Sequence, residues 1–201
     1  EYAYSRMART AGIDMCETHL LFERDFAHFM TQRFDRHGDE RVHLHSLGGM
    51  LHVDYNIPQA VSYEDYFRLI RRLGMQQGDI EQAFRRLVFN VVARNQDDHV
   101  KNLAFLMGRD GRWRLSPAYD MTWAVGSAWT ARHQMTVNGK SDDFVRGDLL
   151  EIGAAFDLPE HGEQIIQQVE QAVHGWHAEA RAVGLDAVWI DELAKRFRRL
   201  V

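Results

Sequence analysis

The chain has 201 residues, of which 45% are apolar, 26% charged and 11% aromatic, with a net charge of −5. This composition and length suit one folded domain or two small ones, and the lone Cys16 excludes an intrachain disulfide framework and favours a reducing compartment such as the cytoplasm. No apolar run is long enough to span a bilayer, so we expect no membrane-spanning segment. Because the net charge is negative, we expect no direct binding to nucleic acid.

The N-terminal part of the chain predicts a helix followed by a hairpin. Apolar residues at helical spacing predict a helix over residues 1–11, with Gly12 at the position of a C-terminal cap. Residues 18–24 and 27–34 are extended segments bounded by polar turns, which predicts a hairpin. The following residues predict a loop, a short helix and an irregular segment, over 35–43, 44–52 and 54–62.

The middle of the chain carries the strongest helical signal. Residues 64–73 and 79–94 show apolar stripes with a period of 3.6, and Asp79 is a candidate N-cap for the second helix. The stripe over 79–94 thickens towards its end, so we expect this helix to form the buried centre of the domain.

The C-terminal half predicts a hairpin and then mostly helices. An apolar run over 103–107 and an extended segment over 113–115 flank a Gly-Arg-Asp-Gly turn, which predicts a second hairpin. A further strand is expected over 132–138. Helices are expected at approximately 146–156, 160–183 and 188–200.

A polar loop between the buried helix and the second hairpin is the candidate functional site. Residues 95–102 hold acidic, imidazole, amine and amide side chains, and the hairpin returns to a second acid at Asp120. Rigid elements that flank a polar loop commonly hold an active site. Protein kinases place a base Asp and a metal-binding Asn five positions apart, with a metal-binding Asp on the next hairpin. Asp97, Asn102 and Asp120 reproduce that layout, and the spacing favours Asp97 over Asp98 as the base.

These segments resemble the HipA family of bacterial serine/threonine kinases. Residues 95–102 (NQDDHVKN) are similar to that family's T-D-x-H-x-K-N loop, and residues 115–120 (LSPAYD) to its L-x-P-x-Y-D segment. Weaker similarities follow in the expected order along essentially the whole chain, at 1–2, 32–36, 85–90 and 138–140. The resemblance implies a mainly helical, protein-kinase-like C-terminal lobe with short hairpins.

The resemblance also implies a role for each matching residue. Asp97 would be the catalytic base, and Asn102 and Asp120 would hold Mg²⁺. The ATP-binding set would comprise the hinge strand and the two segments, namely Gln32, Arg33, Phe34, His99, Val100, Lys101, Asn102, Tyr119 and Asp120. Glu1 would lie on the helix that positions the ATP lysine.

Two departures from the family pattern concern the loop and the region upstream. Gln96 replaces the Thr before the base. No glycine-rich phosphate loop precedes Glu1, and none of the three lysines lies in a suitable strand. By resemblance both parts belong to an N-terminal lobe absent from this chain. Residues 1–34 would then be the hinge-side helix and hairpin, and residues 35–201 the helical lobe. We expect this chain by itself, without the N-terminal lobe, to show weak or no catalysis.

By resemblance, the expected function is ATP- and Mg²⁺-dependent phosphorylation of a protein serine or threonine by the toxin of a toxin–antitoxin pair. The implied partners are a small DNA-binding antitoxin and a protein substrate, with aminoacyl-tRNA synthetases among the family's targets. The residues leave three alternatives open: a small-molecule or lipid kinase, a catalytically inactive partner-binding lobe, and a DNA-binding module.

Other readings of the polar residues also remain open. Asp97 and Asn102 could cap neighbouring helices, His99 could bond to a backbone carbonyl, and Lys101 could be a solvated charge. Asp98 reads as a supporting or solvent-facing acid. The histidines show no spacing that completes a zinc site. Trp123 and Trp129 suit either a substrate groove or the core. The arginine clusters suit solvated helix faces, and they comprise Arg68, Arg71, Arg72, Arg85 and Arg86.

Overall fold

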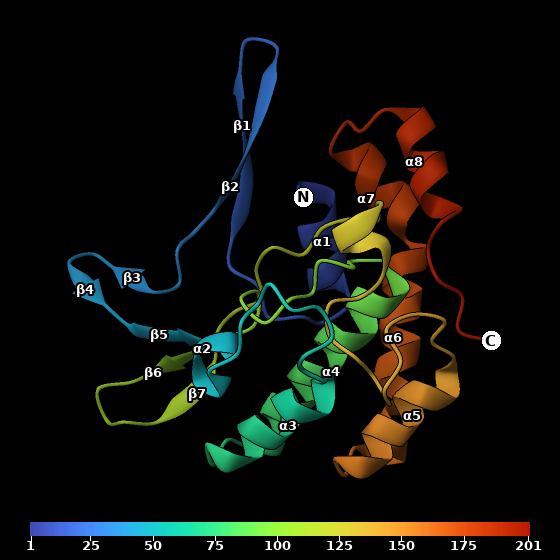
Figure 1. The fold of residues 1–201 in the computed structure, drawn as a ribbon. Coiled ribbons are helices and arrows are strands. Elements are labelled where there is room, and N and C mark those ends of the chain that lie inside the picture. The colour runs from blue at the N-terminus through green and yellow to red at the C-terminus, as the bar shows by residue number, and fades with distance from the viewer.

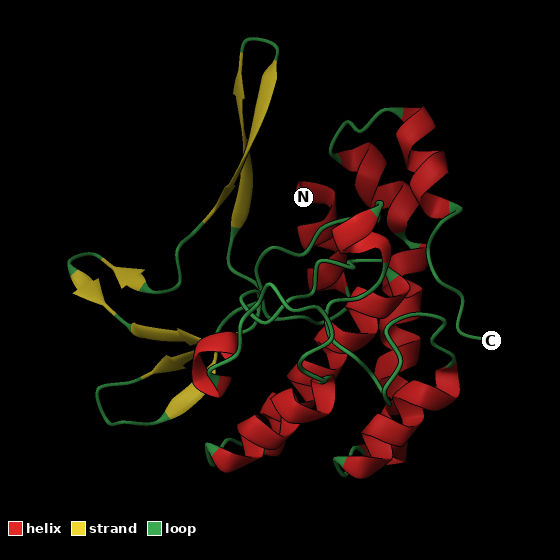
Figure 2. Ribbon diagram, in the orientation of Figure 1, coloured by secondary structure: helices red, strands yellow, loops and turns green.

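The structure, a computed structural model, describes residues 1–201. The α-helices are α1 (Tyr2–Thr10), α2 (Leu47–Leu51), α3 (Tyr63–Arg72), α4 (Gln77–Val92), α5 (Arg146–Ala155), α6 (Glu163–His174), α7 (Trp176–Ala182) and α8 (Ala187–Ala194). The strands are β1 (Thr18–Glu23), β2 (Phe26–Thr31), β3 (Arg36–His37), β4 (Glu40–Arg41), β5 (His43–Ser46), β6 (Ala104–Met107) and β7 (Trp113–Leu115). Two short 3₁₀ turns are η1 (Ala128–Ala131) and η2 (Pro159–Gly162). The strands gather on one side of the molecule and most helices on the other (Figure 2).

Helix α4 is the centre of the hydrophobic core, as its apolar stripe predicted. The helix lies between α3 and α6, and α1 packs against α6 and α7 (Figure 1). Its C-terminal half is buried on all sides, from Arg86 to Val92. Because α4 ends where the polar loop begins, a deeply buried helix holds the start of the candidate site.

The β1–β2 hairpin projects away from the helical body (Figure 1). The strands pair antiparallel from Thr18 opposite Thr31 to Glu23 opposite Phe26, which confirms the predicted hairpin. Four large apolar side chains on it are more than 40% exposed: Leu21, Phe22, Phe26 and Met30. An isolated two-stranded ribbon is at best marginally stable in water, so this hairpin has an unsatisfied apolar surface.

A three-stranded antiparallel sheet, in the order β5-β6-β7, flanks the candidate loop. Strands β6 and β7 form the second predicted hairpin. The segment after β7 is anchored to the N-terminal region because the amide of Ala118 donates to the carbonyl of Asp14 at 2.7 Å. The sheet and this anchor together fix where Asp120 stands relative to the loop.

The predicted loop and short helix over 35–52 are partly wrong. Residues 36–41 form a small hairpin, β3–β4, which turns through Gly38 with a φ of 60°. Residues 43–46 are strand β5, because they pair with β6, and the helix α2 begins only at Leu47. Residues 53–61 contain no helix or strand, as expected from Pro58.

Two predictions on single elements are corrected. Asp79 is not the N-cap of α4: it is the third helical residue, and its carboxylate accepts the backbone N–H of Gln76 at 2.9 Å. Residues 132–138 are not a strand, because their amides bond to different partners. The amide of His133 donates to Ser141, that of Gln134 to the Asp98 carboxylate and that of Thr136 to Val61.

The helix expected over 160–183 is three elements, η2, α6 and α7. Gly175 separates α6 from α7, and glycine is the weakest helix former after proline. The last helix, α8, ends at Ala194, earlier than the predicted residue 200. None of the helices combines the length and the apolar character that crossing a membrane requires.

Candidate functional site

The candidate loop begins where the backbone leaves α4. Arg94 adopts a left-handed conformation with a φ of 60°, and the amide of Asn95 bonds back to the carbonyl of Asn90 at 2.9 Å. A left-handed residue followed by such a bond is a common helix ending. Residues 115–120, which end in Asp120, are called the metal segment below. The chain that follows this segment holds the loop, because the amide of Gln96 donates to the carbonyl of Ala124 at 3.1 Å and the amide of Ala124 donates to the carbonyl of Arg94 at 3.3 Å.

Asp98 is fully buried and saturated with hydrogen bonds. Its carboxylate accepts the Tyr63 hydroxyl at 2.9 Å, the amide of Gln134 at 2.8 Å and, at 2.9 Å, a bond from Nδ1 of His133. Asn90 in turn donates to the Tyr63 hydroxyl. Of the two roles open for Asp98, the supporting one therefore agrees with the structure and the solvent-facing one does not.

Asp97 faces outward, and its side chain is 38% exposed. One carboxylate oxygen, Oδ1, accepts the indole N–H of Trp129 at 2.8 Å, and Nε2 of His99 lies 3.9 Å from the same oxygen. The amide nitrogen of Asn102 donates to the backbone carbonyl of Asp97 at 3.1 Å. These contacts fix the carboxylate and leave its second oxygen, Oδ2, without a protein partner.

Asn102 and Asp120 line the same small hollow, together with Arg86, Asn95 and Asp98. Asp120 is exposed, has a φ of 55°, and its carboxylate makes no hydrogen bond or ion pair within the chain. Asn102 uses its amide nitrogen on Asp97, so its amide oxygen remains available. A free carboxylate and a free amide oxygen are the hard oxygen ligands that Mg²⁺ takes, so these residues fit that ion.

Tyr119 connects the metal segment to the predicted hinge. Its ring lies 5.5 Å from that of Phe34, centroid to centroid, and its hydroxyl donates to the carbonyl of Lys101 at 2.5 Å. Burial, with a further contribution from the Asp120 charge, raises the pKa of Tyr119 to about 12, so the hydroxyl remains a donor at neutral pH.

The remaining predicted site residues are not all gathered at this hollow. Gln32 and Arg33 are exposed, and the Arg33 guanidinium pairs with Asp35 at 2.7 Å. Val100 is a core residue, and its side chain packs on α2 at Gly48. Lys101 is exposed and places its ammonium 3.2 Å from the centre of the Tyr55 ring. Phe34 is the one residue of the predicted hinge set whose side chain reaches the metal segment.

Four residues that shape the site were not assigned to it from sequence: Tyr63, Arg86, Trp129 and His133. Trp129 was left open between a groove and the core, and the structure places its N–H on Asp97. Arg86 was assigned to a solvated helix face, but it is buried and donates to the carbonyl of Ser116 at 2.8 Å. Its place in the fully buried half of the 79–94 stripe was the available signal.

The fold and the arrangement of these segments define a kinase-like C-terminal lobe. Residues 1–176 match the family model described as the HipA-like C-terminal domain, and the chain belongs to that family. The same architecture occurs in HipA of Shewanella oneidensis, solved with HipB and operator DNA, with a TM-score of 0.79 and 18% identity over 97% of this chain. The Helicobacter pylori proinflammatory kinase CtkA aligns over 92% of this chain and 84% of its own, with a TM-score of 0.53 and 13% identity.

Curated relatives carry kinase names. A Haemophilus influenzae protein named "Putative kinase" is 27% identical over 139 residues, and Y4dM of Sinorhizobium fredii, with the same description, is 29% identical over 137 residues. Each alignment covers 60% of this chain but only 39% and 32% of the relative. The chain likewise spans 53% of the Shewanella HipA chain. It therefore spans between about a third and a half of the length of these relatives.

Proposed function

We propose that this chain is the C-terminal lobe of an ATP- and Mg²⁺-dependent kinase that phosphorylates a serine or threonine hydroxyl of a protein. The observation that carries the proposal is the contrast between two adjacent acids. Asp98 is buried and already accepts three hydrogen bonds, whereas Asp97 is half-buried and keeps one carboxylate oxygen free. Asp97 is also oriented by Trp129 and linked through Asn102 to the hollow that Asp120 lines.

In this proposal Asp97 orients the acceptor hydroxyl. Oδ1 is occupied by the Trp129 N–H, so Oδ2 accepts the hydroxyl hydrogen and aligns the nucleophile. Asn102 and Asp120 hold Mg²⁺, which neutralises charge on the phosphates when bound. Phe34 and Tyr119 line the nucleotide side, and Tyr119 also ties the metal segment to the loop through Lys101.

In the complete kinase, an N-terminal lobe would pack against the projecting β1–β2 hairpin. The exposed apolar side chains of β1 and β2 support this, as does the 53% share of the Shewanella HipA chain that this chain matches. HipA in that structure is bound to HipB and operator DNA. By analogy we propose a small DNA-binding antitoxin as partner and a role as a toxin.

Nucleotide binding by Asp120→Asn in the full-length protein tests the metal assignment. Asparagine tolerates the left-handed backbone of this position as aspartate does, so the variant removes mainly the charge. Titration calorimetry should show Mg²⁺-ATP affinity reduced at least about tenfold, because a charged metal ligand is lost. Asp110→Asn, an exposed acid in the β6–β7 turn, is the matched control. Unchanged affinity in Asp120→Asn would show that the metal assignment is wrong.

A further inference from the structure

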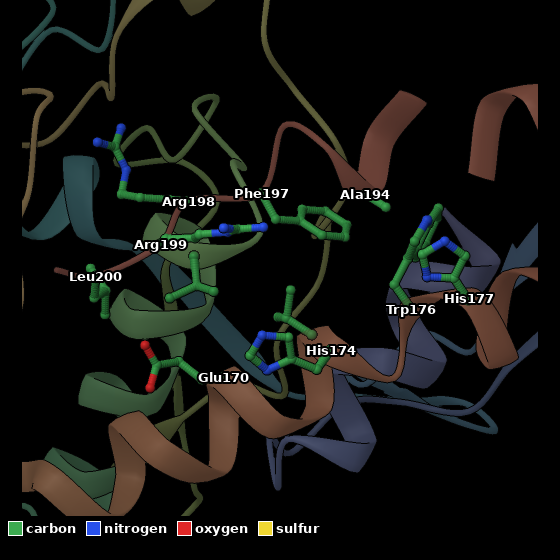
Figure 3. A pocket seen from close by; sticks show the side chains of 11 residues that line it. Glu170, His174, Trp176, His177, Ala194, Phe197, Arg198, Arg199 and Leu200 are labelled. Atoms are coloured by element: carbon green, nitrogen blue, oxygen red, sulfur yellow. The ribbon is translucent and has the colours of Figure 1, made fainter. Parts of the chain in front are cut away.

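A separate cavity of about 330 Å³ lies between α6, α7 and the segment that follows α8 (Figure 3). Glu170 and His174 of α6 stand on one side of it, and Phe197, Arg198 and Arg199 stand on the other. None of the predicted catalytic, nucleotide or metal residues lines it. Its volume falls in the range of small-molecule sites, which is roughly 300–1,000 Å³.

The apolar part of this cavity is preformed. Val173, Trp176 and Phe197 line it, and the rings of Trp176 and Phe197 meet edge to face at 5.6 Å. Trp176 is 2% exposed, and its indole N–H donates to the carbonyl of Ile190 at 2.9 Å. Because the polar atom of this indole already has a partner, the ring offers a rigid apolar wall to a ligand.

The charged groups around the cavity are mostly paired, and one guanidinium is left without a partner. The only acid in the lining, Glu170, lies 2.5 Å from Arg146, which Glu163 contacts as well at 2.8 Å. Arg198 is paired with Asp142, and His177 lies 3.3 Å from Asp191. Arg199 and His174 make no ion pair within the chain, so a permanent cation and an imidazole remain available beside the apolar wall.

We propose that this cavity binds a small amphipathic anion, with a flat apolar body and one carboxylate, sulfonate or phosphate group. The apolar body packs against Trp176, Phe197 and Val173. The anionic group pairs with Arg199, with His174 as a second donor. The combination of a preformed apolar wall and one unneutralised guanidinium at its edge favours this class over neutral apolar molecules and over inorganic ions.

The cavity also contacts the helix that leads into the candidate loop. Val92, the last residue of α4, lies in its wall, and the amide of Arg198 donates to the Val92 carbonyl at 2.9 Å. Asn95 of the loop follows three positions later. A ligand in the cavity should therefore slow amide exchange in the segments around Val92 and Arg198, which gives a readout independent of any kinase activity.

The test is a fluorescence titration of the purified protein with 8-anilinonaphthalene-1-sulfonate, a flat apolar body with one sulfonate. We expect binding at one site, about tenfold weaker in Arg199→Ala, where the charge is lost, and in Ala194→Phe, where the cavity is filled. Arg196→Ala is the matched control, because Arg196 lies in the same segment but does not line the cavity. The neutral N-phenyl-1-naphthylamine should also bind about tenfold more weakly.

The exposed hairpin is the competing site for such a probe, and Phe22→Ser separates the two. Loss of the signal in Phe22→Ser, or wild-type affinity in both Arg199→Ala and Ala194→Phe, would overturn the proposal. Absence of one-site binding by the wild type would overturn it as well. Circular dichroism melting of each variant shows whether it is folded, and hydrogen exchange of the wild type with the probe must protect the segments around Val92 and Arg198.

Discussion

At the residue scale, the two consecutive acids of the loop have opposite environments. Asp98 points into the core, where Tyr63, His133 and the Gln134 amide converge on it, and Asp97 points out towards Trp129. A carboxylate that already accepts three bonds has little capacity left for a substrate hydroxyl. The free oxygen of Asp97 and its five-residue spacing to Asn102 both support the proposal that Asp97, and not Asp98, is the base.

Asp98→Ala should destabilise the protein strongly. The substitution leaves the Tyr63 hydroxyl, the His133 ring and the Gln134 amide without their buried acceptor, a loss of about 3 kcal/mol or more in the free energy of unfolding. Urea unfolding measures this, with the exposed Asp39→Ala as the control. A loss below about 1 kcal/mol would mean that the buried network does not hold the loop.

Trp129→Phe should reduce phosphate transfer while leaving nucleotide affinity unchanged. Phenylalanine keeps an aromatic ring but removes the N–H that fixes Oδ1 of Asp97, so we expect kcat to fall by about ten- to a hundredfold. Trp123→Phe is the control, because Trp123 packs on Phe197 and makes no bond to the loop. Equal kcat values for the two variants would indicate that Trp129 only packs.

At the element scale, α5 contains two glycines, of which one has no room for a side chain and the other does. A Cβ on Gly153 would collide with the backbone carbonyl oxygen of His161, whereas one on Gly147 would meet nothing closer than 3.9 Å. Gly153→Ala should therefore cost about 1–3 kcal/mol of stability by forcing α5 away from η2. Gly147→Ala should stabilise by up to about 1 kcal/mol, since alanine is the better helix former. Thermal unfolding of both variants checks this, and an unchanged Tm for Gly153→Ala would contradict the close packing.

Elements with a local cause were predictable from sequence, and elements set by distant partners were not. The stripe over 79–94 predicted α4 and its burial because period and composition act within one helix. Residues 132–138 have a strand-like composition, but their amides bond to Asp98, Ser141 and Val61. Residues 43–46 became strand β5 because β6, some sixty positions away, provides the pairing.

The candidate site divides in the same way. Asp97, Asn102 and Asp120 could be predicted because they lie in two short segments, where the spacing of the residues is visible in the sequence. Trp129, Tyr63 and His133 contact the two acids across 32 to 35 positions, and no short motif encodes such contacts. For Gln32 and Arg33 the predicted role in the hinge stays a prediction, because both residues are exposed to solvent and, unlike Phe34, do not contact the metal segment.

At the scale of the whole molecule, the projecting hairpin gives the chain an exposed apolar surface, which supports the proposed contact with an N-terminal lobe. The hairpin β1–β2 presents Phe22 and Phe26 at 71% and 68% exposure, and the chain matches about half of the Shewanella HipA chain. Whatever activity the kinase-like lobe supports is therefore best measured in the full-length protein.

The most direct test of the account is phosphate transfer from labelled Mg²⁺-ATP by the full-length protein, with bacterial lysate and the protein itself as acceptors. Wild type should label serine or threonine, and Asp97→Asn should bind nucleotide with similar affinity yet transfer nothing. The labelled acceptor would then identify the substrate. Equal transfer by Asp97→Asn, or bound ATP with no transfer by the wild type, would contradict the assignment of Asp97 as the base of a protein kinase.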